Sequence, residues 1–246
     1  MTTMAERKRQ LPILSWRYFD TLRGDVPSLL LLVLQAPLIG YFCALVWGSV
    51  EKDTPSLYFV LSLSAMWFGC ITACREVVKE RAIVERERFF GLSISAYIGS
   101  KIVVLSCIGA VQVLLLDGVV EWHLNLKGSM PIQLFALWLA SMSGVGLGLL
   151  VSAVASTQER AVFAVPLLIL PQILFSELAI PKEYFSDVVA TVEKGMPVRW
   201  AFQVFQELAK KEPSAMNVVL DFSVLIAFAL VLGALATLVL QRRQEA

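Results

Sequence analysis

Long apolar runs separated by short charged segments dominate this chain. Residues 26–50 and 54–74 carry no Asp, Glu, Lys or Arg, and charged residues bound both runs directly. At about 1.5 Å per helical residue, each run can cross a hydrocarbon core of about 30 Å. The same test along the rest of the chain predicts an all-α, polytopic membrane protein with six spans, over residues 28–50, 55–74, 95–116, 131–155, 161–177 and 217–240.

Ionisable residues mark the ends of several predicted spans. Lys101 lies close to the start of the third span, where we expect its apolar stem to lie in the membrane while its ammonium reaches the interface. The third span is expected to end at Asp117. Asp117, Glu177 and Asp221 are all placed near span ends, where an ionised carboxylate can reach water. The fifth span is short, and two internal prolines interrupt its helical hydrogen bonding.

The composition supports a membrane protein. Charged residues make up 17% of the chain and hydrophobic residues 57%, whereas a soluble domain carries about 25% charged residues. A water-soluble globule is therefore excluded, and disorder is excluded because it requires low hydrophobicity. The formal net charge is +1 and no long basic run is present, so nucleic acid is not an expected partner. The expected surroundings are a lipid bilayer.

The distribution of Lys and Arg predicts which side of the protein faces the cytoplasm. Six spans place both termini on one side, and the segments on that side carry 14 Lys and Arg against two in the short loops opposite. Cytoplasmic loops carry such an excess. We therefore expect cytoplasmic N and C termini, a cytoplasmic tail with an amphipathic helix over residues 1–25, and a membrane domain over residues 26–246. The first apolar run is too long for the h-region of a cleavable signal peptide.

The connection after the second span is unusually rich in charge. Nine charged residues lie within residues 75–88, in a stretch of good helix formers without Gly or Pro. Pairs such as Glu76 with Lys79 have the spacing that supports a helix, and Gly91 is the expected end of that helix, over residues 75–91. Its apolar residues do not collect on one face, which predicts protein contacts on several sides. A solvated loop that only sets topology is an equal alternative.

A second long connection, residues 178–213, lies on the opposite side and is expected to fold back on the membrane surface. It contains two predicted short helices, Lys182–Lys194 and Val198–Lys211, with Pro181 and Pro197 at their first positions. Because it follows a short, kinked fifth span, such a segment can cover the outer end of a substrate pathway between the helices. An ordinary loop that covers the bundle is the alternative.

Catalytic motifs are absent from the sequence. The chain has one histidine, His123, and none of the glycine motifs that bind the phosphates of ATP or dinucleotides. We therefore expect no enzyme activity, cofactor or metal site in this chain. An intramembrane enzyme that uses the three carboxylates above is the least favoured hypothesis. In the fourth span, Gly144 and Gly148 form a pair of small residues that permits close helix contact.

Short stretches of the sequence resemble those of a known protein family. The run ERAIVERERFFGLSISAYIGSK resembles the coupling-helix region of type 2 ABC exporter permeases, particularly the G-subfamily-like branch. The run MPVRWAFQ, residues 196–203, resembles the short segment before the last span of that family. The preceding run LFSELAIP resembles the end of its fifth span, with Glu177 where many members have Gly. The residues that match the coupling-helix pattern are Glu80, Arg81, Arg86, Glu87, Arg88, Gly91, Tyr97 and Lys101.

The resemblance implies a dimeric permease subunit of an ATP-driven exporter, formed with a second copy or a paralogue. Each copy would contact a separate ABC ATP-binding subunit, which holds ATP and Mg and hydrolyses the ATP. The residues that the resemblance places at this contact are Glu76, Glu80, Arg81, Glu85, Arg86, Glu87 and Arg88, with Arg17, Arg23 and Asp25 of an amphipathic connecting helix over residues 17–25. Those expected at an outer gate or re-entrant segment are Glu177, Pro181, Pro197, Arg199 and Trp200.

Besides the intramembrane enzyme, which is least favoured, two functions remain as hypotheses. The leading hypothesis is export of a hydrophobic or amphipathic substrate, such as a lipid, a drug-like compound or a glycan-linked molecule. The substrate would leave the cytoplasm or inner leaflet by alternating access across the inner (cytoplasmic) membrane. The alternative is a non-transporting membrane anchor or scaffold, which recruits a cytosolic partner through residues 75–88.

Overall fold

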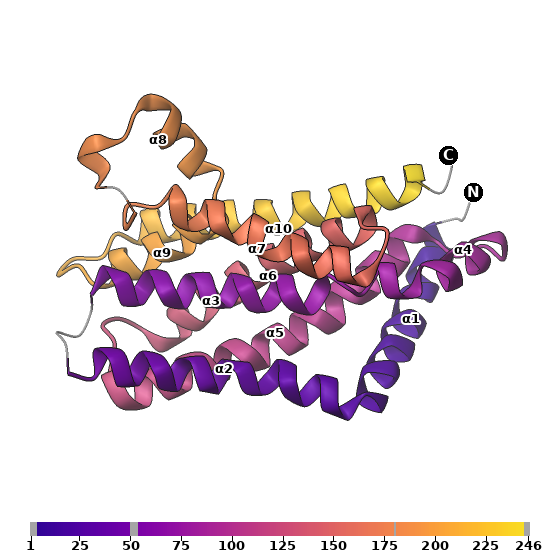
Figure 1. Ribbon diagram of the computed structural model, residues 1–246, viewed down its shortest axis with the longest axis horizontal. Helices are drawn as coiled ribbons and strands as arrows, with labels where there is room; N and C mark the ends of the chain where they lie inside the picture. Colours follow the sequence, from indigo (N-terminus) through magenta and orange to yellow (C-terminus); the bar gives the residue numbers. More distant parts are fainter. Residues whose placement is uncertain (1–3, 50–53, 180, 244–246) are drawn as a thin grey trace.

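The computed structural model describes residues 4–49, 54–179 and 181–243, and these ranges form helices without strands, as the predicted all-α class requires (Figure 1). The side chains of residues 4–8 and of Lys182 lie outside the description, as does Val50, the expected end of the first span. The α-helices are α1 (Met4–Gly24), α2 (Val26–Trp47), α3 (Pro55–Ala73), α4 (Arg81–Phe89), α5 (Ile94–Leu124), α6 (Met130–Val154), α7 (Gln158–Leu174), α8 (Asp187–Lys194), α9 (Pro197–Leu208) and α10 (Ala215–Arg243). Two 3-10 turns are η1 (Val78–Glu80) and η2 (Lys182–Tyr184).

Five helical segments of the described chain are long and apolar enough to cross a membrane. They are α2, the segment Pro55–Phe89 that contains α3, and α5, α6 and α10. The expected fifth span corresponds to α7, which has 17 residues and includes Pro166 and Pro171 within the helix. At about 1.5 Å per residue, α7 is about 26 Å long, which is short of a hydrocarbon core of about 30 Å.

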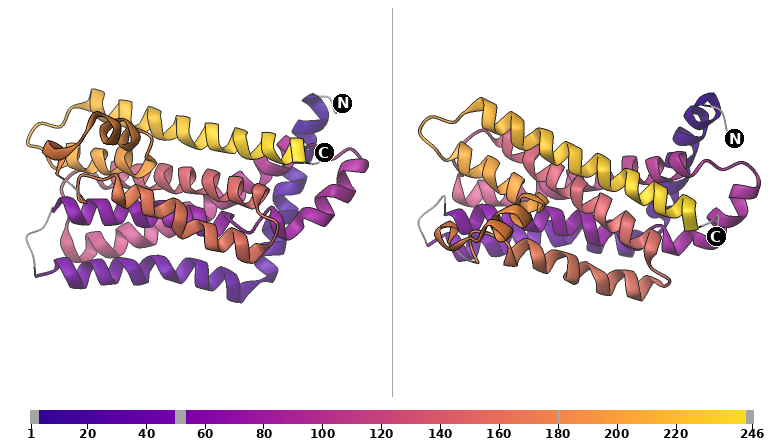
Figure 2. Two further views of the ribbon diagram at one scale, coloured as in Figure 1. Left: turned by 45° about the horizontal axis from the view of Figure 1, so that its top comes forward. Right: turned by 90° about the horizontal axis from the view of Figure 1, so that it is seen from above.

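The long helices lie side by side as a bundle, and α1 crosses one end of it (Figure 1, Figure 2). α1 and α4 lie at the end where α10 finishes, whereas α8 and α9 lie at the opposite end. α7 runs from the first of these ends toward the second, antiparallel to α6. The bundle therefore has two distinct ends, called here the α4 end and the α9 end.

The helix before the first span is longer than expected. α1 begins at Met4, whereas the sequence predicted an amphipathic helix only from Arg17. Leu14 and Tyr18, one turn apart, are buried against the bundle, while Trp16 on the other side of the helix is exposed. This burial at helical spacing stabilises the additional turns.

Two carboxylates lie deeper than predicted. α5 continues past Asp117 to Leu124, where Asn125 in the left-handed conformation caps the helix. Asp117 is therefore inside the bundle and 0% exposed, and Asp221 near the start of α10 is 5% exposed. The prediction that these two groups reach water was wrong. For Asp117 it failed because the third span was ended at its first charge although apolar residues continue beyond it, and for Asp221 because α9 packs against α10. Glu177, which follows α7, is partly exposed.

The connection between α7 and α10 contains shorter helices than predicted. The first expected helix, Lys182–Lys194, is divided into η2 and α8, and α8 starts only after Ser186. The Ser186 hydroxyl accepts a hydrogen bond from the Val189 N–H at 3.4 Å and so caps α8. Pro197 begins α9, as its fixed φ and missing N–H favour.

The closest helix packing joins α3 to α6 through glycines. A Cβ placed on Gly144 would lie 2.2 Å from the carbonyl oxygen of Met66, and one on Gly148 would lie 2.5 Å from that of Cys70. Gly69 of α3 is equally close to the backbone of α6. Only glycine allows such an approach, and the two backbones gain dispersion contacts over their whole length.

Replacing Gly144 by Ala should lower the thermal midpoint of the purified protein, because the added methyl group collides with backbone that cannot rotate away. Overpacking of this kind costs about 1–3 kcal/mol. Gly118→Ala on α5 is the matched control, since nothing lies within 4 Å of a Cβ there. Thermal unfolding of both variants in one detergent measures the difference, and equal midpoints would contradict the packing described.

Candidate functional site at the junction of α1, α4 and α5

The chain between α3 and α5 is a turn, η1 and α4, and not the single helix expected over residues 75–91. α4 ends because Gly91 adopts a φ of +91°. The N–H of Leu92 then donates to the carbonyl oxygen of Glu87 at 3.2 Å. This is a Schellman ending, in which glycine is favoured because a left-handed φ strains other residues.

A buried ion pair lies beneath this linker. The Lys101 side chain on α5 is 1% exposed, and its Nζ lies 2.7 Å from Oε1 of Glu80 and 3.8 Å from Oε2 of Glu76. The prediction that Lys101 reaches the interface was therefore wrong. An ammonium buried without a partner is strongly unfavourable. The pair thus holds the linker against α5.

Two tyrosines complete the surroundings of Lys101. The Tyr97 hydroxyl donates a hydrogen bond to Oε2 of Glu80 at 3.0 Å. The centroid of the Tyr18 ring, from α1, lies 3.5 Å from Lys101 Nζ in a cation–π contact. Burial raises the pKa of the Tyr18 hydroxyl, and the carboxylates of Glu76 and Glu80 raise it further. Tyr18 therefore stays neutral, and its ring joins α1 to the ion pair.

α1 also contacts α4 and the residues that follow it. Arg17 Nη1 lies 2.6 Å from Oε1 of Glu87, and this hydrogen bond raises the pKa of the Arg17 guanidinium. Gln10 Nε2 donates to the Gly91 carbonyl oxygen at 2.9 Å, and Gln10 Oε1 accepts from the Ser93 N–H at 2.9 Å. α4 cannot shift relative to α1 without breaking these contacts.

The C-terminal end of α6 holds the other side of the linker. Ser152 Oγ accepts hydrogen bonds from two consecutive linker N–H groups at 2.9 and 3.0 Å. Arg81 Nη2 donates to the carbonyl oxygen of Ala155 at 2.6 Å, and Arg243 Nη1 from α10 donates to that of Ala153 at 3.0 Å. The last carbonyls of a helix lack intrahelical partners and carry partial negative charge, so two guanidinium groups stabilise them.

The outer side of α4 is not covered by the described chain. Phe89 and Phe90 are 90% and 87% exposed, and Ile83 is also exposed. A depression of about 490 Å³ lies beside them, lined by Glu85, Arg88, Phe89 and Arg243. The sequence predicted protein contacts on several sides of this helix, whereas in the described chain only its inner side is in contact with other helices. Large exposed aromatic side chains beside charges are typical of an interaction surface.

The seven predicted coupling residues fall into two groups. Those that contact other helices of this chain are Glu76, Glu80, Arg81 and Glu87. Those at the outer side of α4 are Glu85 and Arg86, which are exposed, and Arg88, which lines the depression. The first group positions α4, and Glu85 and Arg86 of the second group are exposed on its outer side.

The three predicted connecting-helix residues are not equivalent either. Arg17 contacts α4 through Glu87, as described above. Asp25 instead caps α2, where its carboxylate accepts from the Ser28 N–H at 3.4 Å. Hydrogen bonds from the Ser28 hydroxyl and N–H lower the pKa of the Asp25 carboxyl. Arg23 is exposed at the elbow between α1 and α2. Only Arg17 lies at the junction.

At the α9 end, aromatic and amide contacts fix α9 against α3 and α7. The rings of Tyr58 and Phe205 stack with centroids 5.3 Å apart. Gln172 Oε1 of α7 accepts from the Val198 N–H at 3.3 Å. Gln206 donates to the carboxylate of Glu177, so that this predicted gate residue connects the end of α7 to α9.

The other predicted outer residues hold α8 against the start of α9. Arg199 Nε lies 3.2 Å from Oε2 of Glu193. The Trp200 indole N–H donates to the carbonyl oxygen of Lys194 at 2.9 Å, and the Arg199 guanidinium lies 4.7 Å from the centroid of the Trp200 ring. Pro197 begins α9, whereas Pro181 is exposed before η2.

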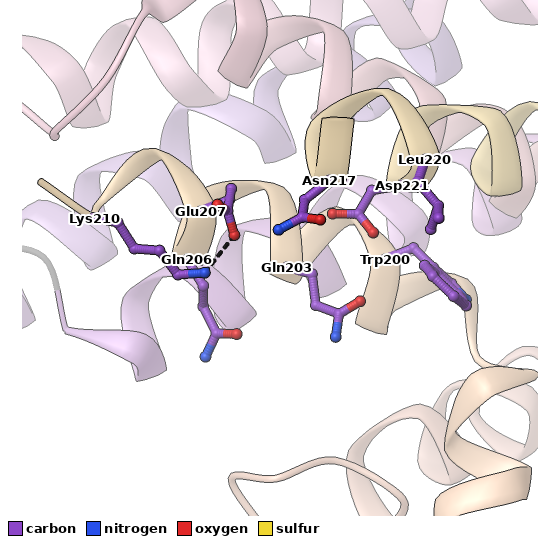
Figure 3. A pocket seen from close by; sticks show the side chains of 8 residues that line it. All are labelled: Trp200, Gln203, Gln206, Glu207, Lys210, Asn217, Leu220 and Asp221. Atoms are coloured by element: carbon purple, nitrogen blue, oxygen red, sulfur yellow. Dashed lines mark hydrogen bonds and ion pairs between the residues drawn. The ribbon is translucent and has the colours of Figure 1, made fainter. Parts of the chain in front are cut away.

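A polar cavity of about 370 Å³ lies between α9 and α10, and no sequence motif pointed to it (Figure 3). Trp200 and Glu207 line it from α9, Lys210 from the connection that follows, and Asn217 and Asp221 from α10. Of these, Trp200 was predicted as an outer-segment residue, and Asp221 as one of the three carboxylates of the least favoured enzyme hypothesis. The consecutive helices α9 and α10 bring the lining residues together because they form a hairpin.

Three residues that complete the junction were not predicted, namely Gln10, Tyr18 and Ser152. Gln10, Leu14 and Tyr18 recur at a spacing of four along α1, and this stripe is the signal that could have found Gln10 and Tyr18. Ser152 has no such signal, because small polar residues are frequent in the fourth span.

The fold and this junction define a helical membrane protein with an exposed charged helix at one end. Residues 9–209 match the model of the ABC-2 type transporter, and the chain belongs to that family. As the sequence resemblance predicted, it is a type 2 ABC permease domain, which is the transmembrane part of a transporter.

A curated relative is similar to part of the chain. It is the ABC transporter ATP-binding/permease protein Rv1747 of Mycobacterium tuberculosis, with 27% identity over 168 residues. The match covers 63% of this chain and 19% of the length of that protein.

Replacing Lys101 by Met should destabilise the protein by about 3–5 kcal/mol, because it leaves the Glu80 carboxylate buried without its cation. Lys79→Met is the matched control. Lys79 Nζ lies 3.8 Å from Glu76, but Lys79 is exposed, so its loss should cost about 0–1 kcal/mol. Thermal unfolding in nanodiscs measures both, and the double variant Lys101→Met with Glu80→Gln should recover part of the loss. Equal effects of the two lysine substitutions would refute the buried pair.

Proposed function

We propose that this chain is the transmembrane permease subunit of an ATP-driven exporter and that α4 is its coupling helix. The observation that carries the proposal is that η1 and α4 together are bound on their inner side by three other helices, while the outer side of α4 presents Phe89 and Phe90. A mobile loop that only sets topology requires neither feature. The family and the ATP-binding/permease relative support the transport class.

The inner contacts suit α4 for the transmission of movement. The Glu87 pair reaches α1, the Glu80 pair reaches α5, and Arg81 reaches the end of α6. A force applied at Phe89 and Phe90 would therefore act on three helices together. We propose that closure of an ATP-binding subunit rotates them as a rigid body between inward-facing and outward-facing states.

In this proposal α7 is the fifth of six spans, and the α4 end is cytoplasmic. α7 runs between the two ends of the bundle, which supports a crossing despite its length. A short span is accommodated by local thinning of the bilayer, at fractions of a kcal/mol per ångström of mismatch. Arg75, Arg81, Arg86 and Arg88 lie at the α4 end, in agreement with the excess of positive charge in cytoplasmic loops.

The further partners in this proposal are a second permease copy or paralogue and an ABC ATP-binding subunit that carries ATP and Mg. In the relative, the name combines ATP-binding and permease parts in one protein. For this chain we propose a separate ATP-binding subunit. The proposed substrate is a hydrophobic or amphipathic molecule that leaves the cytoplasm or inner leaflet.

The double variant Phe89→Ser, Phe90→Ser should lose the ATP-binding subunit without unfolding. The permease is co-expressed with the candidate ATP-binding subunit from its gene neighbourhood, and both co-purification and ATP hydrolysis are measured. Because the two side chains are almost fully exposed, the thermal midpoint should not change, whereas recovery of the complex and stimulation of hydrolysis should both fall.

Trp122→Ser is the control for this experiment, because Trp122 is an equally exposed aromatic residue at the other end of α5. It should leave the complex intact. Undiminished capture by the Phe89, Phe90 variant would show that α4 is not the docking helix. A further outcome is that the wild-type permease captures the ATP-binding subunit and yet changes neither ATP hydrolysis nor substrate transport. That result would favour the membrane scaffold over the exporter.

Labelling from each side of the membrane tests the six-span topology. Glu85→Cys on α4 should react with an impermeant maleimide only from the cytoplasmic side, and Glu183→Cys in η2 only from the opposite side. The unsubstituted chain, with its native cysteines, measures the background. If Glu183→Cys reacted from the cytoplasmic side, α7 would not cross the membrane.

A further inference from the structure

The cavity between α9 and α10 is lined by a set of side chains that packing alone does not explain. α9 buries Phe202, Val204 and Phe205 in the bundle, while Trp200, Gln203 and Glu207 line the cavity. α10 completes it with Asn217, Leu220 and Asp221 (Figure 3). The volume of about 370 Å³ is within the range of small-molecule sites.

The charges around the cavity are mixed in sign. The Glu207 carboxylate is ion-paired with Lys210 and accepts a hydrogen bond from the Ser214 N–H at 2.9 Å. Asp221 is 5% exposed and makes no hydrogen bond with any part of the chain that the structure describes. The Glu207 and Lys210 charges neutralise each other, and the positive charge of the Arg199 guanidinium offsets that of the Asp221 carboxylate. A neutral ligand that donates hydrogen bonds to Asp221 is therefore favoured.

The amide and indole side chains that line the cavity restrict the chemical class of the ligand further. Gln203, Gln206 and Asn217 line the cavity with amide groups, of which the Gln206 NH₂ already donates to Glu177 and Asn217 is hydrogen-bonded to Glu207. Gln203 has no hydrogen-bond partner among the described residues. The Trp200 indole N–H already donates to the Lys194 carbonyl and the Arg199 guanidinium lies 4.7 Å from the ring centroid, so Trp200 contributes the remaining apolar surface of its ring. Paired donors and acceptors beside an aromatic surface complement vicinal hydroxyl groups on a ring.

We propose that this cavity binds a neutral, hydroxyl-rich head group of the sugar type, with Asp221 and Gln203 as hydrogen-bonding partners and Trp200 as an apolar contact. The occupant is an amphipathic molecule whose glycosyl head enters the cavity and whose tail remains among the apolar side chains of α10. Its role in export rests on the function proposed above, whereas the binding itself does not.

Binding of two amphiphiles with the same tail tests the proposal. The permease alone, in phosphatidylcholine nanodiscs, is titrated with octyl β-D-glucoside and with octyl tetraethylene glycol, both below micelle-forming concentration, and tryptophan fluorescence is recorded. Octyl glucoside should give a saturable change, and octyl tetraethylene glycol only the linear change expected from partition into lipid. Asp221→Asn and Gln203→Leu should each weaken the saturable binding about tenfold, the effect of one lost polar contact.

Ser223→Ala is the matched control on α10, because Ser223 is exposed and bonds only the Val219 carbonyl of its own helix. It should bind as the wild type does. Equal responses to the two amphiphiles, or binding unchanged by Asp221→Asn and Gln203→Leu, would overturn the proposal. Tighter binding of octyltrimethylammonium than of octyl glucoside would also overturn it, in favour of a cation site.

Failure of this proposal and failure of the proposed function give different results. Loss of glucoside specificity with an intact, permease-dependent ATP hydrolysis refutes the head-group site alone. Glucoside binding that requires Asp221, in a chain that never captures an ATP-binding subunit, supports the site and refutes the coupling function.

Discussion

The ammonium of Lys101 is the group on which the α4 end of this protein depends. It lies on a membrane helix and out of contact with water, so it requires carboxylates within ion-pair distance, and Glu80 and Glu76 supply them. Both carboxylates belong to the linker between α3 and α4. Solvation of one buried charge therefore determines where α4 lies relative to α5, and the Tyr18 ring adds α1 to the same point.

Polar contacts at helix ends complete the attachment of α4. Arg81 and Arg243 both donate to the last carbonyls of α6, and Ser152 accepts from the linker backbone. Such groups are satisfied by water in a soluble protein, but near a membrane they are costly when left unpaired. The inner side of α4 is therefore attached to the bundle through Arg81, Glu87 and the buried Val84, while Phe89 and Phe90 are exposed beside it.

Much of the fold was predictable because membrane spans are set by length and polarity. The charge-free runs located α2, α3, α6 and α10 within a few residues. The errors occurred at charges. Lys101 and Asp117 were placed at span ends, since a charge in an apolar run is compatible with either the interface or a buried partner, and residue spacing does not distinguish the two. The candidate site was predicted as a charged segment, but the division into Glu76, Glu80, Arg81 and Glu87 facing inward and Glu85 and Arg86 facing outward was not.

The sequence by itself determined the class of protein, the approximate spans, the charged linker and the family resemblance, because these depend on local polarity and short motifs. Only the tertiary structure decided which charges neutralise one another, that α1 reaches α4 through Gln10 and Arg17, and that α9 and α10 enclose a polar cavity. Partners such as Gln10 and Gly91 are far apart in the chain, and they meet only when helix packing brings them together. The physical reason is that burial and pairing are properties of the assembled bundle, whereas hydrophobicity is a property of each residue.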